Sequence, residues 1–416
     1  MNTKIRVLMF GWELPPKISG GLGVACAGLL SGLKNSGQVS VNFCMPQLLA
    51  TRLTAAQLDG LRTVLDDYIS SEAMVETIPA GAGSYTANVT EALSMALAVP
   101  QVLAEHGPFD LIHCHDWLTF LAGVAAKKST GLPLVLHVHS TERDRAGWSQ
   151  NEAIVNIERY ALAHADAIIA VSQQGARRLI KTYGAQAEKI RTIYNATRQL
   201  ESARCPRAKH AVPVVSFIGR ITAQKGPLNF VEAAQRVIAA GVSCRFVMAG
   251  AGDLLPACQA LVVAHGLSEW FEFPGFLDAG AVSALLARTD VFVMPSESEP
   301  FGIAALEAIH AGVPVVISED SGVAEVVESM LKVVHDDVDA IANAITLLIS
   351  NTDMARTLAE EARNQASRLS WDTAGLLTVT LYKDLLCLRA EKFGKGMRLQ
   401  EKGDAERVLQ CDEIVK

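Results

Sequence analysis

The chain has 416 residues, half of them hydrophobic, and this length and composition predict two or three globular domains rather than a disordered chain. Its formal net charge of -7 argues against a nucleic-acid-binding protein, which would present a basic face. The eight cysteines are scattered and form no Cys-x-x-Cys pair, so we expect buried thiols in a reducing compartment rather than a zinc site or structural disulfides.

Hydrophobic runs are short throughout the chain. None reaches the roughly 18 residues that a membrane span requires, and the apolar start, Ile5 to Phe10, is too short for the core of a signal peptide. We therefore expect a cytoplasmic protein without a transmembrane segment. The sequence carries no signal for the oligomeric state.

Short apolar runs alternate with helical patterns in the first half of the chain. We expect strands at Ile5–Phe10, Val39–Met45, Asp110–Cys114, Pro133–His139 and Ala167–Val171. We expect helices at Leu22–Ser36, Thr90–Glu105, Leu118–Ser129, Glu152–Ala163 and Gln173–Tyr183. Regular alternation of strand and helix predicts a parallel sheet covered by helices on both faces.

The alternation lapses at residues 196–212, a polar stretch that we expect to link two domains, and then resumes. Further strands are expected at Val212–Ile218, Phe246–Ala249, Phe271–Phe273, Val291–Met294 and Val313–Ile317, and closing helices at Asp337–Ser350, Met354–Leu369 and 372–388. The charged tail, 391–416, is expected to be a solvated helix or disordered. The fold class is α/β, with two doubly wound Rossmann-like domains, and ligands of such sheets bind beyond the carboxyl ends of the strands.

The segment 295–314 carries two carboxylates just after an expected strand. Glu299 lies in a loop and Glu307 in the helix that follows, where a buried charge needs donors such as the hydroxyls of a sugar or ribose. Glu307 alone is equally well explained as a solvated residue in the first turns of a helix, where acidic residues are favoured.

The whole segment resembles the donor-site signature of the retaining glycosyltransferases of family 4, which have the GT-B fold and are related to glycogen synthases. In that signature seven residues separate two glutamates, framed by Pro-Ser and Gly-x-Pro-Val, as they do Glu299 and Glu307 here. The resemblance implies that Glu299 meets the hydroxyls of the donor sugar and Glu307 the nucleotide ribose. The amides near Phe301 and Gly302, at a helix N-terminus, are expected to face sugar or phosphate oxygens.

Two cations follow the first strand of the second domain, in the pattern Gly219-Arg220-x(4)-Lys225-Gly226. Negative charge builds on a leaving nucleoside diphosphate, and fixed cations stabilise that charge, Arg220 as a fork and Lys225 as a point charge. The alternative is that both are solvated at a domain surface. The matching family pattern favours the leaving-group role and places Gly219 in the donor site.

Three segments of the first domain resemble glycogen and starch synthases. The loop with Gly20 and Gly21, whose amides can approach an anion, is similar to their Lys-x-Gly-Gly-Leu loop, although Lys17 is displaced by one residue. His113–Trp117 is similar to their His-x-His-Asp-Trp run, whose histidines we expect to cap a strand and hydrogen-bond the backbone rather than bind metal. His139 matches the family histidine beside the donor sugar, and the charged run after it, 142–145, is either acceptor-binding or a solvated loop.

Smaller matches complete the pattern. Gly275 lies in a turn that matches the loop contacting the nucleotide base in relatives, and Ser321 replaces the first glycine of the family's Gly-Gly-x-x-Glu loop. Asp337-Val338-Asp339 is formally an Asp-x-Asp metal motif, but Asp337 opens a helical run and is expected to cap it. We therefore expect no catalytic metal and no cofactor, since the nucleotide-sugar is a co-substrate.

The resemblance extends from Ile5 to about Tyr382 and implies a GT-B enzyme whose two domains face each other across a cleft. Its domains would be an acceptor-side domain at 1–204, to which helix 371–390 returns, and a nucleotide-sugar domain at 205–370. It implies a retaining, metal-independent transferase that moves a hexose, expected to be glucose, from a nucleotide-diphosphate sugar to a saccharide acceptor such as an α-glucan. Two alternatives stay open, a nucleotide-sugar epimerase of the same fold and a non-catalytic nucleotide-sugar-binding protein.

Overall fold

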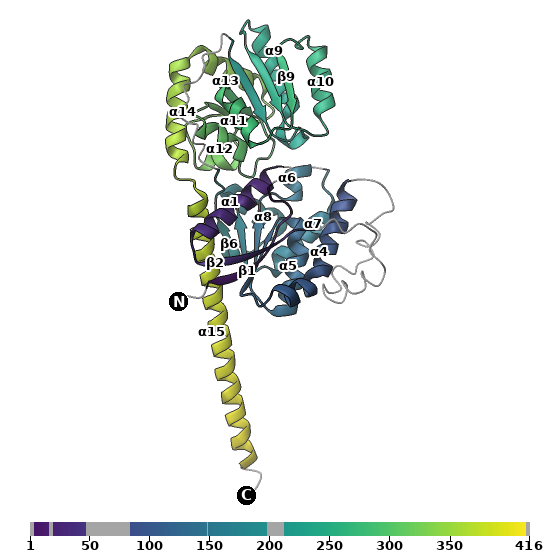
Figure 1. The fold of residues 1–416 in the computed structure, drawn as a ribbon, viewed down its shortest axis with the longest axis vertical. Helices are drawn as coiled ribbons and strands as arrows, with labels where there is room; N and C mark the ends of the chain where they lie inside the picture. The colour runs from purple at the N-terminus through teal and green to yellow at the C-terminus, as the bar shows by residue number, and fades with distance from the viewer. Residues whose placement is uncertain (1–3, 16–19, 47–83, 148, 198–211, 413–416) are drawn as a thin grey trace.

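The computed structural model describes residues 4–15, 20–46, 84–147, 149–197 and 212–412, of which 84–87 and 392–412 are described by their backbone only. Within these residues two six-stranded parallel sheets, each flanked by helices, form two domains that lie one above the other in Figure 1. The two doubly wound α/β domains predicted from the sequence are confirmed.

The N-terminal sheet has the strand order β2-β1-β3-β4-β5-β6. Its strands are β1 (Ile5–Phe10), β2 (Val39–Cys44), β3 (Leu111–His115), β4 (Leu134–Val138), β5 (Ala167–Ala170) and β6 (Ile190–Thr192). Its helices are α1 (Gly21–Asn35), α4 (Ser84–His106), α5 (Trp117–Thr130), α6 (Glu142–Ala146), α7 (Glu152–His164) and α8 (Gln173–Tyr183), with the 3-10 turn η1 (Ala187–Lys189). The strand order reverses between β1 and β3, which places a ligand site at their carboxyl ends.

The C-terminal sheet has the strand order β12-β11-β10-β7-β8-β9. Its strands are β7 (Val214–Ile218), β8 (Arg245–Ala249), β9 (Phe271–Gly275), β10 (Val291–Met294), β11 (Val315–Ser318) and β12 (Leu331–Val333). Its helices are α9 (Pro227–Ala239), α10 (Leu255–Ala264), α11 (Ala279–Ala287), α12 (Ile303–His310), α13 (Val338–Ser350) and α14 (Thr352–Ala366), with the 3-10 turns η2 (Ala223–Lys225) and η3 (Gly322–Glu325). Here the order reverses between β7 and β10.

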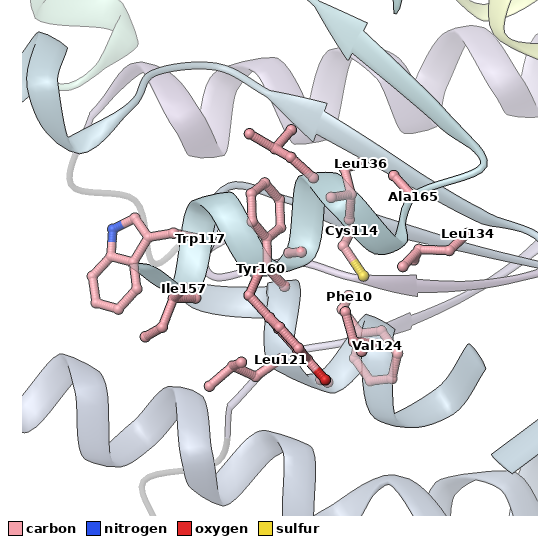
Figure 2. Close-up of a cluster of buried hydrophobic side chains, with 14 of the residues drawn as sticks. Phe10, Cys114, Trp117, Leu121, Val124, Leu134, Leu136, Ile157, Tyr160 and Ala165 are labelled. Carbon is pink, nitrogen blue, oxygen red and sulfur yellow. The ribbon is translucent and has the colours of Figure 1, made fainter. Parts of the chain in front are cut away.

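Alternate residues of the N-terminal strands fill two separate cores, because successive side chains of a strand point to opposite faces. One face carries Cys114 and Leu136 into a cluster with α5 and α7, where Leu121 and Tyr160 pack (Figure 2). The other face carries Val7, Leu111 and Val135 into a cluster with α1 and the last helix. Even-numbered residues of β3 and β4 therefore face the first core, and odd-numbered residues face the second.

The last helix, α15 (Trp371–Asp412), runs from the C-terminal domain past α1 and then projects beyond the N-terminal domain (Figure 1). Trp371, Tyr382 and Leu385 are buried with side chains of α1. The backbones of α1 and α15 lie so close together that a Cβ added at Gly32 of α1 would lie 1.9 Å from the Trp371 carbonyl oxygen. The charged tail continues this helix to Asp412, so helix 372–388 was predicted too short.

Other differences concern short elements. The strands β6 and β12, of three residues each, were not predicted, because three residues carry no readable alternation. Asp337 caps α13 by accepting a hydrogen bond from the Ala340 amide at 2.9 Å, which confirms its capping role. The predicted domain boundary at 204/205 lies outside the described residues. No helix in the described residues is long and apolar enough to cross a membrane.

Candidate functional site

A cleft with a cavity of about 550 Å³ lies between the two sheets, at the carboxyl ends of their strands. Both switch points open into it: Trp12 and Asp116 follow β1 and β3, and Gly219 and Glu299 follow β7 and β10. Of the residues predicted for the site, the cleft is lined by Gly20, Gly21, His139, Gly219, Arg220, Lys225, Glu299, Phe301 and Gly302. Predicted site residues of both domains thus line the same cavity. The role of each residue stays a prediction.

The loop that carries Glu299 is held by backbone contacts to the turn after β11. Glu299 pairs with Ser321 in an isolated parallel bridge, and the Gly322 amide donates to the Glu299 carbonyl oxygen at 2.9 Å. The Val323 amide donates to the Phe301 carbonyl oxygen at 2.7 Å, which seats the Phe301 ring among buried residues. Gly302 has a φ of 106°, a conformation that strains other residues, and ends the loop as the N-cap of α12. These contacts therefore fix the position of the Glu299 loop.

The Glu299 carboxylate is 8% exposed and forms an ion pair with the Lys225 ammonium. The Ser296 hydroxyl donates to the same carboxylate oxygen at 3.4 Å. A buried charge of this kind is stable only with partners, and each of these groups supplies one. Two residues predicted for the donor sugar and the leaving group thus contact each other directly.

Arg220 is exposed at the cleft wall and donates to the Gln224 side-chain oxygen at 3.1 Å. Gln224 is buried and donates in turn to the Ser298 carbonyl oxygen at 3.0 Å, inside the Glu299 loop. Gln224 therefore fixes the Arg220 fork relative to the loop. Sequence analysis missed this role, because a glutamine between two cations has no motif of its own.

Two glycines show how tightly the β7 and β8 ends approach. A Cβ at Gly250 would lie 1.8 Å from the Gly219 carbonyl oxygen, and the Gly250 amide donates to the Gly275 carbonyl oxygen at 2.8 Å. Gly275 itself does not line the cleft; its neighbour Phe276 does, with an exposed ring. Gly275, with a φ of 77°, therefore shapes the turn that presents Phe276.

Glu307 lies on α12, behind the cleft wall rather than on it. Ile303 and Ala304 line the cleft, and Glu307 follows them at spacings of four and three residues, on the same helix face. Its carboxylate has no hydrogen-bond or ion-pair partner among the described residues, and burial raises its pKa to about 7. Glu307 is thus a half-buried carboxyl group beside the cleft wall, and both its ribose-binding role and the solvated alternative stay predictions.

Gly20 and Gly21 begin α1 at the opposite wall, where Gly20 is an N-cap in extended conformation. The Gly23 amide at this helix start donates to the Glu13 carboxylate at 2.9 Å. Lys17 lies outside the described residues, so its phosphate role is not tested.

Asp116 is a cleft residue that the sequence analysis did not select. Its φ of 57° is the only positive value for a non-glycine residue in the described part of the chain, a strain that often marks functional sites. Its carboxylate accepts hydrogen bonds from the His139 amide at 2.6 Å and the Ser140 amide at 3.3 Å. Burial raises the pKa of Asp116 to about 6, although Arg145 opposes the increase. The signal that could have found it is its place directly after His113–His115 at a strand end.

The histidines of that run do not hydrogen-bond the backbone, and this part of the prediction is wrong. His113 shares a hydrogen bond of 2.6 Å with the Tyr382 hydroxyl, and His115 Nδ1 lies 3.0 Å from His139 Nε2. Burial lowers the pKa of His139 to about 3, so its ring is neutral at physiological pH. Positions 113 and 115 face α1 and α15, where Tyr382 supplies a partner that only the tertiary structure brings near.

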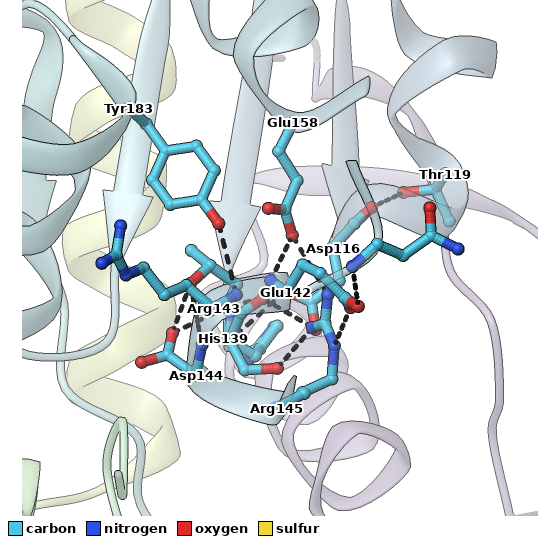
Figure 3. Close-up of polar contacts among 12 residues, drawn as sticks. Asp116, Thr119, His139, Glu142, Arg143, Asp144, Arg145, Glu158 and Tyr183 are labelled. Atoms are coloured by element: carbon cyan, nitrogen blue, oxygen red, sulfur yellow. Dashed lines mark hydrogen bonds and ion pairs between the residues drawn. The ribbon is translucent and has the colours of Figure 1, made fainter. Parts of the chain in front are cut away.

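The charged run 142–145 forms α6 and is not a solvated loop (Figure 3). Glu142 is 1% exposed, and its amide donates to the Glu158 carboxylate at 2.8 Å. Arg145 lines the cleft and donates to Glu158 at 3.1 Å. Burial raises the pKa of Glu158 to about 7, against the opposing charge of Arg145. The run therefore anchors one cationic side chain at the wall of the cleft formed by the N-terminal domain.

The two domains contact each other beside the cleft. The Ser298 hydroxyl donates to the Asp144 carboxylate at 2.8 Å, and Arg178 pairs with the same aspartate. On a second contact, Glu325 of η3 accepts hydrogen bonds from the Gln173 and Gln174 amides, at 2.8 and 2.6 Å, at the N-terminus of α8. Two sets of contacts between the domains thus lie beside the cleft.

Comparisons with known proteins agree with this geometry. The model of the family described as "Glycosyl transferase 4-like domain" matches residues 20–196, and that of "Glycosyl transferases group 1" matches residues 201–365. The chain is 30% identical over 414 residues to the alpha-maltose-1-phosphate synthase of Mycolicibacterium smegmatis, with 91% of this chain and 99% of the relative covered. It is 26% identical over 402 residues to the glycogen synthase of Mycobacterium tuberculosis, with 91% and 94% covered.

Among solved structures, Anabaena HepE in complex with UDP-glucose has the same fold. It superposes with a TM-score of 0.68 at 19% identity, over 91% of this chain and 100% of that one.

Proposed function

The chain belongs to the GT-B glycosyltransferases, and from this premise we propose that it is a retaining hexosyltransferase that moves glucose from a nucleotide-diphosphate sugar to an α-glucan or oligosaccharide. One observation carries the proposal: the cleft joins the Lys225–Glu299 pair and Arg220 of one domain to His139 and Asp116 of the other. Cations for a leaving diphosphate and acceptors for sugar hydroxyls thus lie within one cavity.

The leaving diphosphate is proposed to lie against Arg220 and Lys225. Charge builds on its oxygen as the bond to the sugar breaks, and preorganised cations stabilise that charge most strongly where water is excluded. Gln224 holds the Arg220 guanidinium before the donor arrives. The two side chains supply the positive charge for the leaving group, so the proposed reaction uses no metal cofactor.

The donor sugar is proposed to lie between Glu299 and His139. The Glu299 carboxylate accepts from sugar hydroxyls while it keeps Lys225 close to the phosphate, so one ion pair orients both halves of the donor. Asp116 holds the His139 amide and thereby sets where His139 stands beside the sugar. Glu307 is proposed to accept from the ribose hydroxyls, which would give its carboxylate the partners that it lacks.

Retention is proposed to follow a front-face route. The bond from the anomeric carbon to the phosphate oxygen breaks, the acceptor oxygen bonds to the same face of that carbon, and the acceptor's proton passes to the leaving phosphate. Among the described residues that line the cleft, the three carboxylates already bind other groups: Glu299 binds Lys225, Asp116 the His139 amide and Glu13 the Gly23 amide. The proposed route gives these carboxylates positioning roles and needs no covalent nucleophile.

Glucose and an α-glucan acceptor are proposed because of the relatives. A glycogen synthase and an alpha-maltose-1-phosphate synthase match nearly the whole chain, and HepE was solved with UDP-glucose. The resemblance of the Gly20-Gly21 loop and of His113–Trp117 to glycogen synthases points the same way.

A panel of UDP-, ADP- and GDP-sugars, each with and without maltooligosaccharides, tests the proposal by release of nucleoside diphosphate. We expect release from one glucose donor, strongly increased by the acceptor and abolished by Glu299→Ala or Arg220→Ala. Isomerised sugar formed from donor alone would favour the epimerase. Nucleotide-sugar binding without release from any donor would favour the binding protein, and turnover that survives both substitutions would place the site elsewhere.

A further inference from the structure

Four histidine rings lie together at the floor of the cleft, between the N-terminal sheet and helices α1 and α15. His113 and His115 occupy alternate positions of β3, His137 lies opposite His115 on β4, and His139 follows β4 two residues later, so all four share one face of the sheet. The His137 and His139 rings stack with centroids 4.2 Å apart, and those of His113 and His115 at 4.6 Å. Only His139 reaches the cavity.

Most nitrogens of this cluster have no protein partner in the described part of the chain. The buried nitrogens without a hydrogen-bond partner are His113 Nε2, His115 Nε2, His137 Nδ1, His137 Nε2 and His139 Nδ1. Burial of a polar atom without a hydrogen bond is costly, and most buried polar atoms in proteins are paired. Five such atoms, against three nitrogens with partners, mark the cluster as a poorly satisfied polar site.

Two groups of side chains in the described residues could hold an ion, one of His113, His115 and His137 and one of Cys26, His115 and His139. The ligand atoms of each lie within 4.8 Å of one another. The first group has only neutral ligands and no opening, so a doubly charged ion would be buried without an anion, at high cost. The second includes a thiol and opens into the cleft through His139, which gives an ion a way in and a place for a water ligand.

The geometry of the second group suits a tetrahedral ion. His115 Nδ1 and His139 Nε2 face each other at 3.0 Å, close to the roughly 3.3 Å that separates two nitrogens bound to one tetrahedral zinc ion. Cys26 comes from α1, on the other side of these rings, and is a free, buried cysteine.

We propose that Cys26, His115 and His139 bind a divalent ion of the zinc class at the floor of the cleft, and that the bound ion inhibits the enzyme. Thiolate and imidazole ligands favour zinc and cobalt over magnesium or calcium. The ion displaces the thiol proton of Cys26 to solvent and replaces the hydrogen bond between His115 Nδ1 and His139 Nε2. The proton of that hydrogen bond moves to the outer nitrogen of the ring that carries it, His115 Nε2 or His139 Nδ1. The inhibition rests on the proposed function, because it follows from the place of His139 beside the donor sugar; the binding does not.

The test is titration of the untagged, reduced full-length protein with Co²⁺ in the absence of nucleotide. We expect one Co²⁺ per chain, with visible bands of tetrahedral coordination and a near-ultraviolet thiolate-to-cobalt band, and displacement by Zn²⁺. Cys26→Ala should abolish the thiolate band and weaken binding at least about tenfold. Cys114→Ala is the matched control, since Cys114 is buried on β3 but points into the opposite core, and it should titrate as the wild type does.

Absence of a stoichiometric Co²⁺ band, or an unchanged band in Cys26→Ala, overturns the proposal. Melting temperatures of both variants establish that each is folded, and His115→Gln provides a second ligand change that should also weaken binding. Inhibition is measured as the Zn²⁺ concentration that halves each protein's own transfer rate, and Cys26→Ala should need at least about tenfold more. If no donor is turned over, the Co²⁺ spectrum still tests the ion site. Transfer without a Co²⁺ band would reject the ion site and leave the proposed transferase function standing.

Discussion

The ion pair of Lys225 and Glu299 couples the two chemical tasks assigned to the C-terminal domain. Loss of one member leaves the other charge buried without a partner. This destabilises the folded protein by more than the intact pair stabilises it. The pair exists before a donor binds, with Ser296 as a further partner, so the donor meets groups already in position. Preorganisation of this kind reduces the reorganisation needed in the transition state.

Glu299→Gln should therefore lower kcat by about 100-fold or more, because the amide keeps the shape but cannot hold Lys225 by charge. Steady-state kinetics with the preferred donor measures the effect. Glu297→Gln is the matched control, two residues away in the same loop and exposed, and should retain nearly full activity. Equal losses in the two variants would mean that the loop, not the carboxylate, matters.

Glu307 gives a pH dependence with a definite sign. Its pKa is raised from 4.5 to about 7, so the folded state holds the proton more tightly than the unfolded state, and its contribution to stability is lost as pH rises from 4.5 to 7. Ribose hydroxyls would stabilise the charged form and return part of that loss. Donor affinity should thus increase as pH rises through about 7.

The measurement is the donor dissociation constant by calorimetry between pH 5.5 and 8.5, in wild type and Glu307→Gln. The substitution should weaken donor binding at pH 8 and remove most of the increase with pH. It should also raise the melting temperature at pH 8 more than at pH 5, because it removes a buried charge. A wild-type affinity that does not change with pH would contradict the ribose assignment.

Sequence alone could predict those site residues whose neighbours form a motif. Glu299, Arg220 and Lys225 each follow a strand in a recognisable spacing, and the structure brings them to one cleft. Gln224 and Cys26 could not be found in this way, and the sequence signals Asp116 only by its place directly after His113–His115 at a strand end. Their significance comes from a backbone angle, a hydrogen bond to another loop and a contact between helix and sheet, none of which leaves a periodic trace in the chain.

At the scale of elements, the packing of α15 on α1 ties the end of the C-terminal half to the N-terminal domain. Gly32 of α1 and Gly375 of α15 are in contact, since a Cβ at Gly375 would lie 2.4 Å from the Gly32 carbonyl carbon. A Cβ at Gly28 would lie 2.0 Å from the nearest atom of the Trp371 indole ring. Side chains at these glycines would force the helices apart.

Gly32→Ala should lower the free energy of unfolding by about 1 to 3 kcal/mol, the usual cost of overpacking, despite the higher helix propensity of alanine. Urea unfolding measures it. Gly280→Ala in the exposed first turn of α11 is the control, because its Cβ would meet its nearest atom at 3.4 Å, an ordinary contact, and it should be neutral or slightly stabilising. A neutral Gly32→Ala would show that the helices are not packed this closely.

Long elements could be predicted from periodicity, and short ones could not. The strands that carry the site, β1, β3, β7 and β10, are buried apolar runs and were placed within about one residue of their ends at the cleft, with β1 and β10 ending at Phe10 and Met294 as expected. The edge strands β6 and β12 have three residues and partly exposed patterns, which look like loop in the sequence. Edge strands owe their pairing to the neighbouring strand, not to their own composition.

For the molecule as a whole, two sets of contacts join the domains beside the cleft. Glu325 binds the free amides at the N-terminus of α8, where the helix dipole favours a negative charge. Asp144 holds Ser298 in the Glu299 loop from the other side of the cleft. Contact between the domains and the position of the Glu299 loop are therefore physically linked.

Glu325→Ala should shift the protein towards open conformations, because two helix amides and the Tyr194 hydroxyl lose their acceptor. We expect a larger radius of gyration by small-angle scattering without nucleotide, and a donor KM increased about 2- to 10-fold, since only the closed fraction binds productively. Glu319→Ala, an exposed neighbour, is the control. An unchanged radius and KM would show that this contact does not control closure.

The central claim is that this cleft transfers glucose with retention of configuration, and proton NMR of the complete reaction tests it most directly. The wild-type protein is incubated with an α-linked nucleotide-glucose donor and maltooligosaccharide, and the anomeric signals are followed from the first minutes. The account predicts that the donor signal decreases as a new α-linked glucosyl signal grows on the acceptor, and that neither change occurs with Glu299→Gln. A β-linked product, or isomerised donor without a new linkage, would contradict it.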